Sequence, residues 1–148
     1  MHWLGLGLGR SSVSFMPKPY NPDAKPEDTD PVVKDGLLLT NVFNRMIRTA
    51  FYTVQNLELE GIPAVQPEEK FLAEANKAVL EYERYMAKFA FHQCIYVMDT
   101  YIRNGSKYLA KTLNTAVTEI LDGKRDRDEV LQPLANLFHI IRTAAVLM

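Results

Sequence analysis

Apolar residues between positions 34 and 148 recur every three or four residues, the spacing that places side chains on one side of an α-helix. The first such stretch runs from Asp35, a residue type that caps helices, to about Gln55. Its apolar side comprises Leu39, Phe43, Met46, Ile47, Ala50 and Val54, and its opposite side comprises Asn41, Arg45, Arg48 and Tyr52. The pattern therefore predicts an amphipathic helix with one face on a core and a polar face outside.

A second and a third helix are expected further along the chain. The second begins near Pro67, and its apolar stripe consists of Phe71, Ala75, Val79, Tyr82 and Met86. No Gly or Pro interrupts residues 68–104, and one helix of that length is unusual in a compact domain. We therefore expect a turn near residues 87–90 and a third helix with Phe91, Cys94, Ile95, Met98 and Ile102 on its inner face.

The pair Asn104-Gly105 predicts the end of the third helix, because Gly often follows a helix end. A fourth helix is expected from Ser106 to Leu121, with Leu109, Leu113, Val117 and Ile120 on its apolar side. The last helix would carry Leu131, Leu134, Phe138, Ile141 and Ala145, with Pro133 in its first turn or at a kink. No strand-like alternation occurs, so residues 34–148 are expected to form an all-α, five-helix bundle.

Residues 1–33 have a different composition. Residues 15–33 are rich in Pro and Asp, which predicts an extended arm or linker. Before them, Trp3, Leu4, Leu6 and Leu8 alternate with glycines, and Arg10 and three serines follow. This composition is similar to an organelle transit peptide but has little positive charge, so we favour a tail. We expect a cytoplasmic location, with the mitochondrial matrix as the alternative.

Overall composition is that of an ordinary globular domain. The 148 residues are 47% hydrophobic and 24% charged. Because the net charge is −1, any nucleic-acid site must be a local patch. The single cysteine, Cys94, excludes an internal disulfide, and the apolar runs are too short for a membrane span to be expected.

Motifs for catalysis or metal binding are not found in the sequence. His2, His92 and His139 lack metal-ligand spacing, and no Glu-x-x-His pair lies on a predicted helix. The glycines at 5, 7 and 9 do not follow a strand and lack the Gly-Lys-Ser ending of a phosphate loop. We therefore expect a non-enzymatic chain without a metal or cofactor.

Two groups of polar residues remain as candidate binding sites. The first helix carries Asn41, Asn44, Arg45 and Arg48. The region around the predicted helix break carries Arg103, Asn104, Lys107, Tyr108 and Lys111. Amides pair with base edges, cations hold phosphates and aromatic rings stack on unpaired bases. Residue types alone thus leave two interpretations: an RNA-binding surface is the first, and an ordinary solvated helix exterior is the second and the more common one.

Two sequence motifs support the first interpretation. The stretch Leu38 to Arg45 resembles the first-helix Asn-x-x-Asn-Arg signature of the anticodon-binding helical domain of methionyl-tRNA synthetases. The stretch Tyr101 to Lys111 resembles that family's Tyr-Ile-Asp…Pro-Trp-x-Leu-Ala-Lys segment, and residues 86–95 resemble a helix of the same domain. The resemblance implies that Asn41 and Arg45 contact the anticodon.

The second motif departs from the family in three positions. Its Trp falls on Tyr108 or on Lys107, its preceding Pro is absent, and Arg103 replaces its Asp. A Tyr at the Trp position would still stack on a base, but these changes leave selectivity for the methionine anticodon open.

The resemblance covers residues 34–148, and the adenylate-forming signatures of the family's catalytic domain do not occur. It therefore implies a non-catalytic tRNA- or RNA-binding module with a role in protein biosynthesis. One alternative is a scaffold subunit of a larger assembly, including an organellar one, with the N-terminal arm contacting a neighbouring subunit. A further alternative is the accessory domain of a split synthetase, which a catalytic chain completes in trans.

Overall fold

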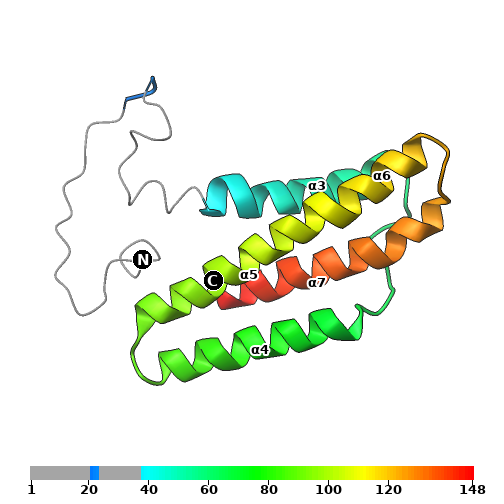
Figure 1. Ribbon diagram of the computed structural model, residues 1–148. Helices are drawn as coiled ribbons and strands as arrows, with labels where there is room; N and C mark the ends of the chain where they lie inside the picture. The colour runs from blue at the N-terminus through cyan, green and yellow to red at the C-terminus, as the bar shows by residue number, and fades with distance from the viewer. Residues whose placement is uncertain (1–20, 24–37) are drawn as a thin grey trace.

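The computed structural model describes residues 21–23 and 38–148, with side chains in the second range described from Asn41 onward. Within these residues the fold is all-α, without strands, and consists of four long helices side by side in a bundle (Figure 1). The predicted arm at 1–33 lies outside the described residues, except for a short turn in which the Asp23 amide donates to Asn21 Oδ1 at 3.0 Å.

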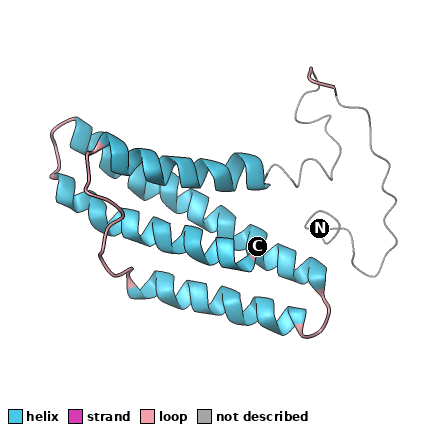
Figure 2. Cartoon of the chain, turned by 180° about the vertical axis from the view of Figure 1, so that it is seen from behind, coloured by secondary structure: helices cyan, strands magenta, loops and turns pink. Residues whose placement is uncertain are grey.

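The first helix has the two faces that the sequence predicts. It starts as a π-helical segment, η2 (Leu38–Phe43), and continues as α3 (Asn44–Asn56). Phe43, Met46 and Ala50 are buried, whereas Asn41 and Arg45 are exposed. The predicted start at residue 35 lies outside the described residues. The long loop 57–68, visible in Figure 2, then leads to the second helix.

The second and third helices form an antiparallel hairpin with the turn where it was expected. They are α4 (Glu69–Met86) and α5 (Phe91–Tyr108), and residues 87–90 connect them. Phe71, Ala75, Cys94, Ile95, Met98 and Ile102 face the core, as predicted. Met86 and Phe91 do not, because they lie at the tip of the hairpin, where no other helix covers them.

The prediction of a helix end at Asn104-Gly105 is wrong. The helix continues without a break from α5 through the π-helical η3 (Leu109–Leu113) into α6 (Asn114–Leu121) (Figure 1). Gly105 is buried where this helix meets two others. A Cβ there would lie 2.6 Å from Ile140 Cγ2 and 2.7 Å from Met46 Cε. Gly105 thus permits close helix packing, and the bundle has four helices in the described region instead of the predicted five.

The end of α6 and the start of the last helix follow the sequence signals. Gly123 has a positive φ of 71°, and the neighbouring Lys124 amide donates to Glu119 O at 2.8 Å. A short 3-10 segment, η4 (Arg127–Val130), leads into α7 (Leu131–Leu147). Pro133 lies in the first turn of α7, where a missing backbone donor is tolerated.

Helix α7 supplies much of the core. Leu134, Leu137 and Ala144 are fully buried, whereas Ala145, which was predicted to face inward, is exposed. Contrary to the expectation from the short apolar runs, residues 127–147 are long and apolar enough to cross a membrane by length and composition alone. However, 56% of that most apolar stretch is buried among the other helices, as in a core helix.

Candidate nucleic-acid interface

The structure brings the two sequence motifs into contact. Arg45 Nη2, on α3, donates a hydrogen bond of 3.2 Å to Ser106 Oγ on α5, a residue 61 positions away in the sequence. Met46, the residue after Arg45, approaches Gly105, the residue before Ser106, closely in the core. The absence of a side chain at Gly105 allows this approach. Gly105 therefore lets α3 pack close to α5, and this packing puts Arg45 beside Ser106.

The exposed face of η2 and α3 carries amides and cations. Asn41, Asn44, Arg45 and Arg48 are all exposed, in agreement with the predicted polar face. The guanidinium of Arg48 lies 5.7 Å from the centre of the Tyr52 ring. No Asp or Glu occurs between positions 35 and 58, so no carboxylate on this helix opposes an approaching phosphate.

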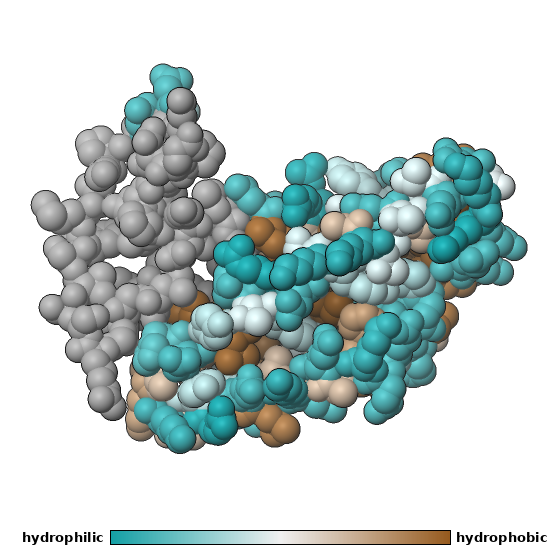
Figure 3. Space-filling view, viewed as in Figure 1, coloured by the Kyte–Doolittle hydropathy of each residue, from teal (hydrophilic) through white to brown (hydrophobic). Residues whose placement is uncertain are grey.

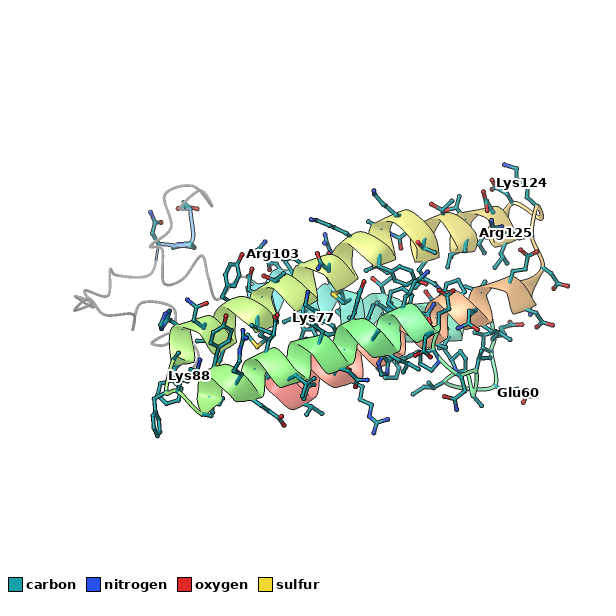
Figure 4. The ribbon with its side chains drawn as sticks, turned by 60° about the horizontal axis from the view of Figure 1, so that its bottom comes forward. Glu60, Lys77, Lys88, Arg103, Lys124 and Arg125 are labelled. Carbon is teal, nitrogen blue, oxygen red and sulfur yellow. The ribbon has the colours of Figure 1, made fainter. Side chains whose placement is uncertain are left out.

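The neighbouring stretch of α5 and η3 is also free of acidic residues, from position 100 to 118. Arg103, Lys107 and Lys111 are exposed on it, together with Asn104. The side chain of Arg103 is held by Asp99, whose Oδ2 lies 2.9 Å from Arg103 Nε, so part of its charge is neutralised. In Figure 4 Arg103 lies on the side of α5 away from α4.

These two stretches create a local excess of positive charge in a chain whose net charge is −1. Together they hold five Arg and Lys residues and no Asp or Glu. The side chains do not all point in one direction. Asn104, Lys107 and Lys111 have the spacing i, i+3, i+7 and share one face of the helix, whereas Ser106 lies on the side toward α3. The result is a wide polar surface over two adjacent helices, seen as hydrophilic side chains over α5 in Figure 3.

Tyr108, the predicted stacking residue, is partly buried and packs against the core. Its ring packs edge-on against Phe71 of α4, with 4.7 Å between ring centres. Its hydroxyl accepts a hydrogen bond of 3.2 Å from Asn136 Nδ2 and donates one of 3.5 Å to Pro133 O. Burial raises the pKa of this hydroxyl. The side chain therefore packs against the core on the side where α4 and α7 lie, and it does not share the surface of Arg45.

Asn136, which sequence reasoning did not single out, organises the interior around Tyr108. The residue is completely buried, and its Oδ1 accepts hydrogen bonds from the Glu68 amide at 2.9 Å and from Gln132 Nε2 at 3.3 Å. Gln132 Nε2 also donates to Gln66 O at 2.9 Å. The network fixes the start of α4 on α7. The sequence contained a signal for this network, because Asn136 lies in the middle of an apolar helix, where a buried amide without hydrogen-bond partners would be costly.

Tyr52, which is 50% exposed, supplies an exposed ring on the polar face of α3. Phe51 is similarly exposed, but its ring packs edge-on against Phe138. Asn41, Arg45, Arg48 and Tyr52 are spaced i, i+4, i+7 and i+11, and this spacing puts all four on one helix face. The sequence thus contained the signal for Tyr52, and the packing of Tyr108 against the core makes Tyr52 the ring that lies beside Arg45 and Arg48 on this face.

Other reactive groups do not form a second site in the described part of the chain. No group of three or more His, Cys, Asp or Glu side chains is placed to hold a metal among residues 21–23 and 41–148. Cys94 is buried, and burial raises the pKa of its thiol, which disfavours the nucleophilic thiolate. Burial also lowers the pKa of His139, with the charge of Arg142 adding to the effect.

The described residues define an all-α bundle with a cationic, amide-bearing surface over two helices. In comparisons with known proteins, no family model, no curated protein and no solved structure matches the chain. The link to the synthetase domain therefore rests on the sequence resemblance alone.

Proposed function

We propose that this chain is a non-catalytic RNA-binding module that resembles the tRNA anticodon-binding domain of methionyl-tRNA synthetase. The observation that carries the proposal is the contact between Arg45 and Ser106, which makes one surface of two motifs far apart in the sequence. That surface carries amides, cations and an aromatic ring on two neighbouring helices, and such groups recognise unpaired nucleotides.

Each side chain has a role suited to its chemistry. The amides of Asn41 and Asn44 pair with base edges, because an amide offers both a donor and an acceptor. Arg45, fixed in direction by Ser106, contacts a base or phosphate with the remaining donors of its guanidinium. Tyr52 and Arg48 form a stacking pair for an unpaired base.

The lysines extend this surface along the RNA backbone. Lys107 and Lys111 are exposed and lie one helical turn apart, where each can neutralise a phosphate. A surface with so few cations binds weakly, with a dissociation constant on the order of micromolar or above and a strong dependence on salt.

Titration of the chain with unmodified tRNA at two salt concentrations tests the proposal. We expect saturable binding, and Arg45→Ala should weaken it and reduce the slope of log K against log salt by about 1. Arg84→Ala is the matched control, because Arg84 is an exposed arginine on α4, on the other side of the bundle from α3 (Figure 1). Absence of saturable binding, or equal effects of the two substitutions, would contradict the proposal.

A scaffold subunit is the second candidate, and the internal position of Tyr108 favours it. In the second motif, residues 101–111, the Tyr108 ring packs against Phe71 and is not available for stacking on a base. The exposed groups of this motif that remain are cations and an amide. Native purification distinguishes the two functions. Stable protein partners without RNA, together with wild-type behaviour of Arg45→Ala, would support the scaffold.

A further inference from the structure

The tip of the α4–α5 hairpin exposes large apolar side chains. Met86, Phe89 and Phe91, here called the apolar tip, are 40%, 79% and 43% exposed. The two rings contact each other edge-on, with 6.3 Å between their centres. In Figure 3 the corresponding end of the bundle shows tan and brown surface. Large apolar side chains that remain exposed near one another, two of them in contact, make a candidate binding surface.

The backbone at Phe89 supports a role for its ring. Phe89 has a φ of 54°, in the left-handed region that favours glycine, and the Ala90 amide donates to Tyr85 O at 3.0 Å to close the turn. A bulky residue in this conformation is strained, and strain of this kind is retained where the side chain makes a useful contact. No described residue covers most of this ring.

The fold places the apolar tip near the point where the N-terminal part of the chain joins the bundle. Figures 1 and 2 both show the start of η2 and the α4–α5 turn at the same end of the molecule. Residues 9–37, as an extended chain at about 3.1 Å per residue, would reach on the order of 90 Å. This reach exceeds the length of the bundle itself, because even the continuous helix over residues 91–121 measures only about 45 Å. Residues 1–8 are therefore within reach of the tip.

We propose that the apolar tip binds the chain's own segment Trp3–Leu8. This segment supplies Trp3, Leu4, Leu6 and Leu8, whose apolar side chains match the phenyl rings and the thioether of the tip. Because the contact is intramolecular, the effective concentration is on the order of 1 mM, and an intrinsic dissociation constant of about 0.1 mM leaves about nine-tenths of the molecules closed. The proposal does not depend on RNA binding.

Trp3 provides the measurement, since it is the only tryptophan in the chain. In the intact folded chain, we expect its emission to be blue-shifted and its quenching by acrylamide to be slower than in the same chain unfolded in urea. Phe89→Gly removes the ring and puts glycine where φ is positive, so the turn itself is not weakened. Losing one buried phenyl ring weakens such a contact about tenfold. The closed fraction would then fall from about nine-tenths to about one half.

Leu121→Ser is the matched control, because Leu121 is 68% exposed at the end of α6, at the opposite end of the bundle. It should leave Trp3 unchanged, and circular dichroism confirms that both variants fold. A wild-type Trp3 as accessible as in urea would overturn the proposal, as would equal effects of the two substitutions. Protection of Trp3 that disappears on dilution would also overturn it, since a second copy would then be the occupant.

Discussion

Substituting Gly105 by Ala tests the packing that places Arg45 beside α5. Gly105 is an interior position of the continuous helix formed by α5, η3 and α6. By helix propensity alone, Gly→Ala would stabilise the protein by about 1 kcal/mol. The new methyl group, however, would meet Ile140 Cγ2 at 2.6 Å and Met46 Cε at 2.7 Å. Both contacts are too short to persist, so a neighbour or a helix must move.

The cost of that movement should exceed the gain. Met46 can turn its flexible end away, but Ile140 Cγ2 is attached to a branched carbon with restricted rotation. Overpacking in a core costs about 1–3 kcal/mol, and two simultaneous clashes place this case in the upper part of that range. After subtracting the propensity gain of about 1 kcal/mol, we expect Gly105→Ala to lower the free energy of unfolding by about 1–2 kcal/mol.

Urea denaturation followed by circular dichroism measures this difference, and a double-mutant cycle assigns it to the clash. On an Ile140→Ala background, Gly105→Ala should become neutral or stabilising by up to about 1 kcal/mol, a coupling of about 1–3 kcal/mol. Gly61→Ala is the control, because nothing lies within 4 Å of the position that its new methyl group would occupy; its effect should stay within about 0.5 kcal/mol. A Gly105→Ala protein more stable than wild type by about 1 kcal/mol would refute the packing argument.

Three further outcomes follow from the same structure. Asn136→Ala leaves the Glu68 amide and the Tyr108 hydroxyl without their buried partner, and should lower the free energy of unfolding in urea by about 2–3 kcal/mol; wild-type stability would contradict the network. Tyr52→Ala should weaken tRNA binding by about 1–3 kcal/mol through lost stacking, whereas Tyr108→Phe should leave affinity unchanged, and equal losses would show that Tyr108 also reaches the RNA. Because burial lowers the folded-state pKa of His139 below 6.5, the unfolded chain binds more protons at a pH between the two pKa values. Stability should therefore fall as the pH drops from 6.5 toward the lower folded pKa, and a His139→Gln variant with an unchanged pH profile would contradict this assignment.

Helical periodicity in the sequence was enough to predict most of the core-facing residues, although Met86, Phe91 and Ala145 are exposed. Met46 and Ala50 of α3 and Leu109 and Leu113 of the long helix are buried where the periodicity placed them. This was possible because helical spacing and the partition of apolar side chains away from water are local properties. The polar face that includes Arg45 follows from the same spacing, so a candidate surface could be predicted without knowing how the helices pack.

Residues whose neighbours come from distant helices take roles that depend on how those helices pack. The sequence signal at Gly105 is the same for a helix end and for a close helix crossing, and Met46 and Ile140 select the crossing. The sequence pattern allowed Tyr108 to face either water or the core, and a hydrogen bond from Asn136 on α7 to its hydroxyl keeps the side chain packed against the core. Phe91 continues an apolar stripe but lies beyond the end of its packing partners and is exposed. The spacing of apolar residues predicts which side of a helix faces the core. Whether each apolar side chain on that side is buried depends on where the other helices lie.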